Sequence, residues 1–196
     1  MDNVYVHETH VMAKKTEAPA LMVTSEIGTL KRLLVHSPDS GLGKVVPSKA
    51  QDWLFEDIVH LDTIRRKEYD YYTKVLLYFL DPEKVQGKLK DIDHPKAKRN
   101  FYKPDHPDFY RSDKVIELQW LLSDILLDRE IKLKLVASVC ALEGVAYCEQ
   151  MRMMDIDAGK LAKIFISGTS DENEMIFAPI PNFIFTRDIG IVINNY

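Results

Sequence analysis

Apolar residues follow two different spacings in the first part of the chain, and each spacing predicts a different element. A short apolar run at 30–35 lies between Gly28, which permits a turn, and Pro38, which ends the run, so we expect a buried strand there. From 58 to 79 apolar residues recur close to the helical period, and this predicts a helix with Asp57 near its first turn.

The middle of the chain, at about 80–170, is predicted to be helical apart from one ordered loop at 93–108. The loop is rich in Pro, Lys, Tyr and His, and its aromatic residues favour burial. Its two Asp-His pairs lack the spacing that aims ligands at one ion, so we expect no metal site there. The expected helices, with their caps, are 115–126 after Ser112 or Asp113, 131–142 before Gly144, and 158–165 between Asp157 and Gly168.

The last part of the chain returns to strand-like patterns. Apolar runs at 175–178 and 189–194 flank the segment 179–188, which reads Pro-Ile-Pro-Asn-Phe-Ile-Phe-Thr-Arg-Asp. Its two prolines disfavour helix in the residues before them, and the alternation of Phe183 with Phe185 then predicts a strand.

This strand is expected to carry a polar cluster. Asn182 offers an amide, Phe185 a flat apolar face, and Asp188 a carboxylate that can accept two parallel N–H bonds from a planar cation. The three residue types together make a candidate guanidinium pocket. A turn followed by a structural Arg187–Asp188 ion pair is the alternative interpretation.

Composition narrows the possible functions. The 196 residues are 46% hydrophobic, enough for a core of their own, and one to two domains are expected. A net charge of −4 gives no reason to expect nucleic acid or an anionic membrane as a partner. The sequence shows neither an apolar run long enough for a membrane span nor a secretory signal, so a cytoplasmic protein is expected. Cys140 and Cys148 lie in helical patterns and are expected to be buried, inert thiols.

The segment 179–188 closely resembles the signature of the arginine deiminases, which belong to the guanidine-modifying (amidinotransferase, or pentein) superfamily. The segment 25–38 resembles the start of the same family, with a Ser-Glu-Ile-Gly turn, a Leu/Val strand and a His-x-Pro exit. A third segment, Trp-Leu-Phe-Glu-Asp-Ile at 53–58, is similar to the family's Leu-Phe-Asp-Asp-Ile element. It departs from the family at Glu56 and matches at Asp57.

The resemblance implies an α/β fold, part of a pseudosymmetric pentein propeller with an inserted helical bundle. The expected domains are a leader at 1–23, a first α/β module at 24–80, a helical insert at 81–170 and the start of a second α/β module at 171–196. Open strand edges in an incomplete propeller attract partners, so a homo-oligomer is expected.

The resemblance also implies a function: hydrolysis of L-arginine, or a related guanidine, to citrulline and ammonia through a Cys nucleophile, without a cofactor. In this interpretation Asp188 binds the guanidinium and is the only member of the catalytic machinery in the chain. Phe185 packs on the guanidinium plane, and Asn182 contacts the amino-acid end of the substrate. Leu54 and Asp57 lie at the rim of the site, although Asp57 is equally well explained as a helix cap.

Several parts of the family's machinery are not found in this sequence. The second Asp, the His, the Glu and the nucleophilic Cys belong to later modules of the family, and both cysteines here precede the motif. The chain also has Ile189 where the family usually has Pro. We therefore expect a truncated form of a longer enzyme that is inactive by itself. A non-catalytic guanidinium-binding or assembly module of the same fold is the alternative function.

Overall fold

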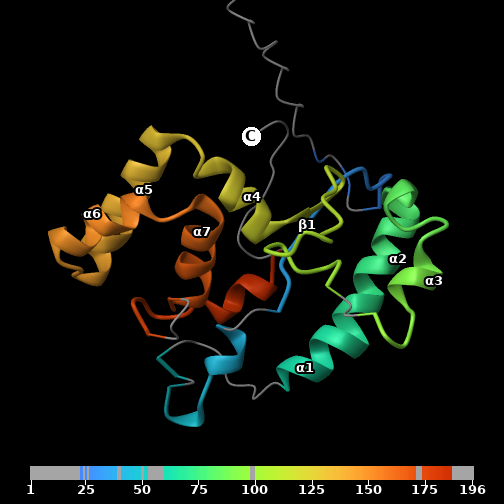
Figure 1. The fold of residues 1–196 in the computed structure, drawn as a ribbon, viewed down its shortest axis with the longest axis horizontal. Helices are drawn as coiled ribbons and strands as arrows, with labels where there is room; N and C mark the ends of the chain where they lie inside the picture. The colour runs from blue at the N-terminus through green and yellow to red at the C-terminus, as the bar shows by residue number, and fades with distance from the viewer. Residues whose placement is uncertain are drawn as a thin grey trace, which may run out of the picture. The chain divides into compact units, whose positions relative to one another are not determined.

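Two short parallel strands form the sheet in the part of the chain that the structure describes (Figure 1). Strand β1, Leu33–Val35, pairs with β2, Val115–Glu117, so that Leu33 lies opposite Val115 and Val35 opposite Glu117. The structure is a computed structural model, and it describes residues 23, 25, 27–38, 41–49, 51–52, 60–97, 100–170 and 174–186.

Most of the described chain is helical, which makes the fold a mixed α/β arrangement with a small sheet. The chain divides into two compact units, residues 29–190 and residues 1–28 with 191–196. All the named elements lie in the first unit. They are η1 Leu42–Lys44, η2 Pro47–Lys49, α1 Leu61–Thr63, the π-helical η3 Ile64–Tyr69, α2 Asp70–Leu80, η4 Pro82–Lys84, α3 Leu89–Ile92, α4 Leu118–Ile125, α5 Arg129–Glu143, α6 Tyr147–Asp155, α7 Ala158–Ser167 and η5 Pro181–Ile184.

Two large hydrophobic clusters and a small one at Leu42 and Val45 stabilise the described part of the unit 29–190. The first lies among α4, α5, α6 and α7 and includes Leu161, Met153 and Phe177. The second joins the sheet to α2 and to aromatic residues of the loop before β2, among them Tyr102 and Tyr110. Burial of these side chains is the main favourable term in folding, and each fully buried one contributes about 1.5–3 kcal/mol.

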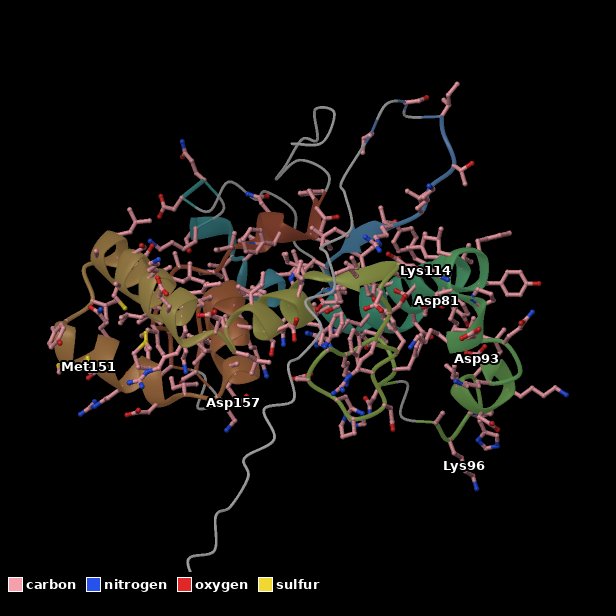
Figure 2. All side chains as sticks on the ribbon, turned by 90° about the horizontal axis from the view of Figure 1, so that it is seen from above. Asp81, Asp93, Lys96, Lys114, Met151 and Asp157 are labelled. Carbon is pink, nitrogen blue, oxygen red and sulfur yellow. The ribbon has the colours of Figure 1, made fainter. Side chains whose placement is uncertain are left out.

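A polar contact beside the second cluster joins Asp81, which follows α2, to the turn that precedes β2. Ser112 Oγ donates to Asp81 Oδ2 at 2.7 Å, and Lys114 Nζ lies 3.7 Å from Asp81 Oδ1 (Figure 2). Ser112 Oγ also accepts from the backbone N–H groups of Lys114 and Val115 at 3.1 and 3.0 Å. These bonds stabilise the turn that leads into β2.

Several sequence predictions are confirmed. The strand expected at 30–35 is present as β1, and the helix expected at 58–79 is present over the described residues from Leu61 to Leu80. Asp157 Oδ1 caps α7 by accepting from two backbone N–H groups, and Gly144 and Gly168 end α5 and α7 in the left-handed conformation. The loop aromatics at 101, 102, 109 and 110 are buried as expected.

The prediction that 115–126 is one continuous helix is wrong at its start. Val115 and Ile116 are β-branched and favour an extended backbone, and the ladder to β1 satisfies their backbone groups. Glu117, not Ser112 or Asp113, therefore caps the helix, which begins at Leu118.

Three further predictions need correction. The segment at 183–185 is not a strand, because Pro181 stands at the first position of the 3₁₀-helix η5, where its fixed φ favours a helical turn. At 175–178 only Met175 pairs, in an isolated antiparallel bridge with Thr169. Cys148 is exposed, whereas Cys140 is buried as predicted. Residues 1–22 of the leader expected at 1–23 and the strand expected at 189–194 lie outside the described residues, and the domain boundaries stay a prediction.

Candidate functional site

The candidate site lies where both strands of the sheet end. His36 and Ser37 follow β1 directly, and Glu117 is the last residue of β2. Because the strands are parallel, these residues meet at the same edge of the sheet. The carboxyl ends of parallel strands are where open α/β sheets commonly bind their ligands.

Glu117 links the two strand ends through a buried carboxylate. Its side chain is fully buried, and Oε1 lies 3.0 Å from His36 Nδ1. The same oxygen accepts from the backbone N–H and the hydroxyl of Ser37 at 3.1 and 3.3 Å. Oε2 accepts from Trp120 N at 2.8 Å, which caps α4. Since an ionised carboxylate only accepts, its contact favours the proton on Nδ1 of His36 and fixes the orientation of that ring.

The motif segment is attached to strand β1 and to His36, which follows that strand. Thr186 Oγ1 donates to the backbone oxygen of Leu34 in β1 at 2.9 Å. The ring of Phe183 meets the ring of His36 edge-on, with centroids 6.5 Å apart and an interplanar angle of 84°. The helix η5 is thus held by His36 through Phe183, and the chain after it is held by β1 through Thr186.

Helix α7 positions the chain that leads into the motif. Its C-terminal Gly168 has φ +74°, and its carbonyl oxygen accepts from Ile176 N at 2.8 Å and from Phe177 N at 3.1 Å. Ile180 N donates to Ile166 O at 3.1 Å. A Cβ atom at position 168 would stand 2.4 Å from the oxygen of Phe177, so the chain returns against α7 only because this residue is glycine.

The structure places two of the five residues predicted for substrate binding. Asn182 is half-buried in η5, and Phe185, which follows η5, is half-exposed. Phe185 N donates to Asn182 O at 3.0 Å, so the two residues share one turn. Leu54, Asp57 and Asp188, as well as Arg187, lie outside the described residues.

Sequence reasoning missed the Glu117–His36–Ser37 cluster. The signal was the pair of β-branched residues before Glu117, which favours a strand that ends at a carboxylate. A strand ending there, parallel to the one that ends before His36, brings both polar ends to one edge of the sheet.

Burial shifts the pKa of a tyrosine in the second hydrophobic cluster and of a cysteine in the first. It raises the pKa of Tyr110 well above the ordinary value of 10, and the negative charge of Glu117 raises this pKa further, so Tyr110 stays neutral. Burial also raises the pKa of the Cys140 thiol, whose Sγ lies 3.6 Å from Met153 Sδ. Cys140 is therefore a packed thiol and not an activated nucleophile.

Within the described residues, no group of three or more His, Cys, Asp or Glu side chains is placed to hold a metal ion. None of the described helices is both long enough and apolar enough to span a membrane.

Comparisons with known proteins point to one family. No family model matches the sequence. The arginine deiminase of Mycoplasma capricolum is 30% identical over 171 residues, which is 85% of this chain and 37% of the relative. The arginine deiminase of Lactococcus lactis subsp. lactis is 25% identical over 187 residues, 88% of this chain and 41% of the relative. That of Pediococcus pentosaceus is 41% identical over a shorter stretch of 59 residues.

The match covers most of this chain but only part of each relative. The chain spans about two fifths of the length of the relatives that match most of it, at 37% and 41% of those proteins. The similarity extends well beyond the motif at 179–188, because it covers 85–88% of this chain. The resemblance seen in the sequence is thereby confirmed, and the chain is a homologue of the arginine deiminases that corresponds to part of their length.

Proposed function

We propose that this chain forms part of an enzyme that hydrolyses the guanidinium group of L-arginine to citrulline and ammonia, and that it supplies part of the substrate-binding site. The observation that carries the proposal is the similarity of nearly the whole chain to proteins named arginine deiminase. The attachment of the motif segment to strand β1, through Thr186 and Leu34, supports the same function.

In this proposal, three residues of the motif contact different parts of the substrate. Asp188 accepts two parallel N–H bonds from the guanidinium, a charge-assisted geometry that is stronger than neutral hydrogen bonds. Phe185 packs on the guanidinium plane, and its half-exposed ring leaves a surface for this contact. Asn182 binds the amino-acid end of the substrate. Leu54 and Asp57 complete the rim of the site.

The Glu117–His36 pair has a positioning role in this proposal. Both side chains are buried, so neither is placed to contact a substrate directly. Their contact fixes the strand ends, and the ring of His36 meets Phe183 in the turn that also contains Asn182. The pair thereby holds the binding residues in one orientation.

The chemical step requires groups outside this chain. Attack on the guanidinium carbon needs an activated nucleophile and an acid/base to move protons. The raised pKa of Cys140 opposes a thiolate, and Cys148 is an exposed residue of α6. As the family resemblance implies, the nucleophile in this proposal comes from a later segment of the whole enzyme. The fold implied is a pentein propeller, and the activity is a cytoplasmic step in arginine breakdown that needs no cofactor.

Titration calorimetry with purified chain 1–196 tests the proposal. L-Arginine should bind, whereas L-citrulline, which has the same shape but no positive charge, should bind at least about 30-fold more weakly because it loses the charge-assisted pair. The chain should release no citrulline from arginine. Equal affinity for the two ligands would contradict the guanidinium site. Citrulline production that disappears in Cys140→Ala or Cys148→Ala would contradict a nucleophile outside the chain.

A further inference from the structure

The outer face of α2 is exposed and apolar. Five large side chains form it, and we call them the α2 stripe: Tyr71, Tyr72, Val75, Tyr78 and Phe79, with exposed fractions of 50%, 51%, 55%, 51% and 77%. Since successive residues of an α-helix are about 100° apart, these five cover a sector about 120° wide. The stripe is therefore one continuous face and not a set of scattered surface residues.

The opposite face of α2 is already covered. Leu77 and Thr73 are fully buried, and Leu77 packs in the second hydrophobic cluster. The ammonium of Lys74 contacts Asp70 at 2.8 Å and Asp93, and it also lies 4.9 Å from the centre of the Tyr71 ring, at one margin of the stripe. The helix is thus apolar on two opposite faces, and a helix of this kind is normally covered on both of them.

The spacing of the stripe is symmetric about its centre. Val75 lies in the middle, Tyr72 and Tyr78 are three residues away on either side, and Tyr71 and Phe79 are four residues away. If a second copy of α2 runs antiparallel with Val75 facing Val75, each Tyr72 faces a Tyr78 and each Tyr71 faces a Phe79. The smallest side chain then lies at the crossing point, where the two helices approach most closely.

The size and composition of the stripe fit such a pairing. A fully covered aromatic side chain buries about 150–250 Å², so the half-exposed stripe offers roughly 500 Å² per copy. Two copies then bury roughly 1,000 Å², which is about the minimum for a specific interface. Tyr and Phe are enriched at interface centres and charged residues are depleted there, as they are in the stripe.

We propose that the α2 stripe is a self-association surface, on which two copies of this chain pack their α2 helices antiparallel across a two-fold axis at Val75. A two-fold axis requires the same patch on both partners, and the symmetric spacing of the stripe meets this requirement. The interface is independent of the strand edges and of the residues proposed to bind arginine.

Sedimentation equilibrium of the purified chain measures the dimer and its dissociation constant. Val75→Glu places two carboxylates opposite each other at the axis and should weaken the dimer by about 100-fold or more. Leu142→Glu is the matched control, because Leu142 is an 85% exposed apolar residue on α5, and this variant should leave the dissociation constant unchanged. The thermal midpoint of each variant checks its folding.

Oxidative crosslinking tests the register in a Cys148→Ser background. Val75→Cys should form a disulfide with itself, because a residue on the axis faces its own copy within the 4.4–6.8 Å that a disulfide needs between Cα atoms. Tyr71→Cys alone should not, because its two copies lie about 12 Å apart along the helices. A mixture of Tyr71→Cys and Phe79→Cys should form the heterodimer.

The results distinguish self-association through the α2 stripe from other ways of covering the stripe or of forming a dimer. A monomer at all concentrations would overturn the proposal, and so would a dimer that is unaffected by Val75→Glu and fails to crosslink at position 75. The first result is expected if a segment of a longer chain covers the stripe, and the second if strand edges pair.

Discussion

Substitution of Gly168 by alanine tests how α7 positions the motif segment. Gly168 and Gly144 end helices α7 and α5 with similar φ values of +74° and +68°. An alanine in this left-handed region costs about 1–2 kcal/mol through its own backbone strain. At Gly144 that strain is the whole cost, because no atom lies within 4 Å of the added Cβ.

At Gly168 a second cost is added. The new Cβ would stand 2.4 Å from Phe177 O and 2.9 Å from Pro179 N, which are backbone atoms that cannot rotate away. The chain must move and lose the bonds that Gly168 O accepts from Ile176 N and Phe177 N, together with the bond from Ile180 N to Ile166 O. At about 1 kcal/mol for each bond, the total cost of Gly168→Ala is about 4–5 kcal/mol.

Urea unfolding and calorimetry with L-arginine are the assays. Gly168→Ala should lower the free energy of unfolding by about 3 kcal/mol more than Gly144→Ala, and its thermal midpoint by about 6–12 °C more. Gly168→Ala should also weaken arginine binding, because the displaced chain carries Asn182 and Phe185, whereas Gly144→Ala should not. Equal losses of stability in the two variants, with equal affinity for arginine, would refute the positioning role of α7.

Two further predictions concern the buried groups around the strand ends. Glu117→Gln replaces one accepting oxygen by a donor that faces other donors, and it should lower the free energy of unfolding by about 2–4 kcal/mol in a urea titration. Glu149→Gln is the control, because it only breaks an exposed ion pair with Arg152. This variant should lower the free energy of unfolding by less than about 1 kcal/mol. Tyr110→Phe should raise stability at pH 7 by about 1 kcal/mol, because this buried hydroxyl has no hydrogen-bond partner among the described residues. Since burial raises the pKa of both Tyr110 and Tyr69, both stay protonated in the folded chain, and stability should fall above pH 10, where the unfolded chain ionises, by up to about 1.4 kcal/mol per pH unit for each of the two residues. Tyr110→Phe should flatten that slope and the exposed Tyr147→Phe should not, and equal slopes in both variants would contradict the burial argument.

Local signals in the sequence predicted the parts of the fold that depend on local chemistry. Asp157 accepts bonds from the first turn of α7, and Gly168 supplies the left-handed residue at its end, so both ends of this helix are determined by neighbouring residues. The apolar period also identified α2. It did not identify the buried face, because α2 is apolar on two faces and only tertiary contacts decide that Leu77 is covered while Val75 and Phe79 are exposed.

The candidate site was predictable only in part, because its geometry comes from contacts between distant segments. The strand β2 forms because β1, more than 80 residues earlier in the chain, supplies its hydrogen-bond partners. Glu117 becomes a bridge between strand ends only after that pairing, although its residue type alone suggested a surface position. At η5 the local preference of Pro181 for a helical turn prevailed over the alternation of Phe183 and Phe185.

Substitution of Asp188 by asparagine tests whether the motif binds a guanidinium. The change keeps the shape of the side chain but removes its charge and turns one acceptor into a donor toward the substrate's own N–H groups. We predict that calorimetry finds L-arginine bound at least about 30-fold more weakly, with a thermal midpoint within about 2 °C of the unchanged chain. Asp157→Ala, which removes the cap of α7, should show the opposite pattern, a midpoint lowered by about 2–4 °C and an unchanged affinity. Unchanged arginine affinity in Asp188→Asn, with a lowered midpoint, would contradict guanidinium binding by the motif and leave Asp188 with a structural role.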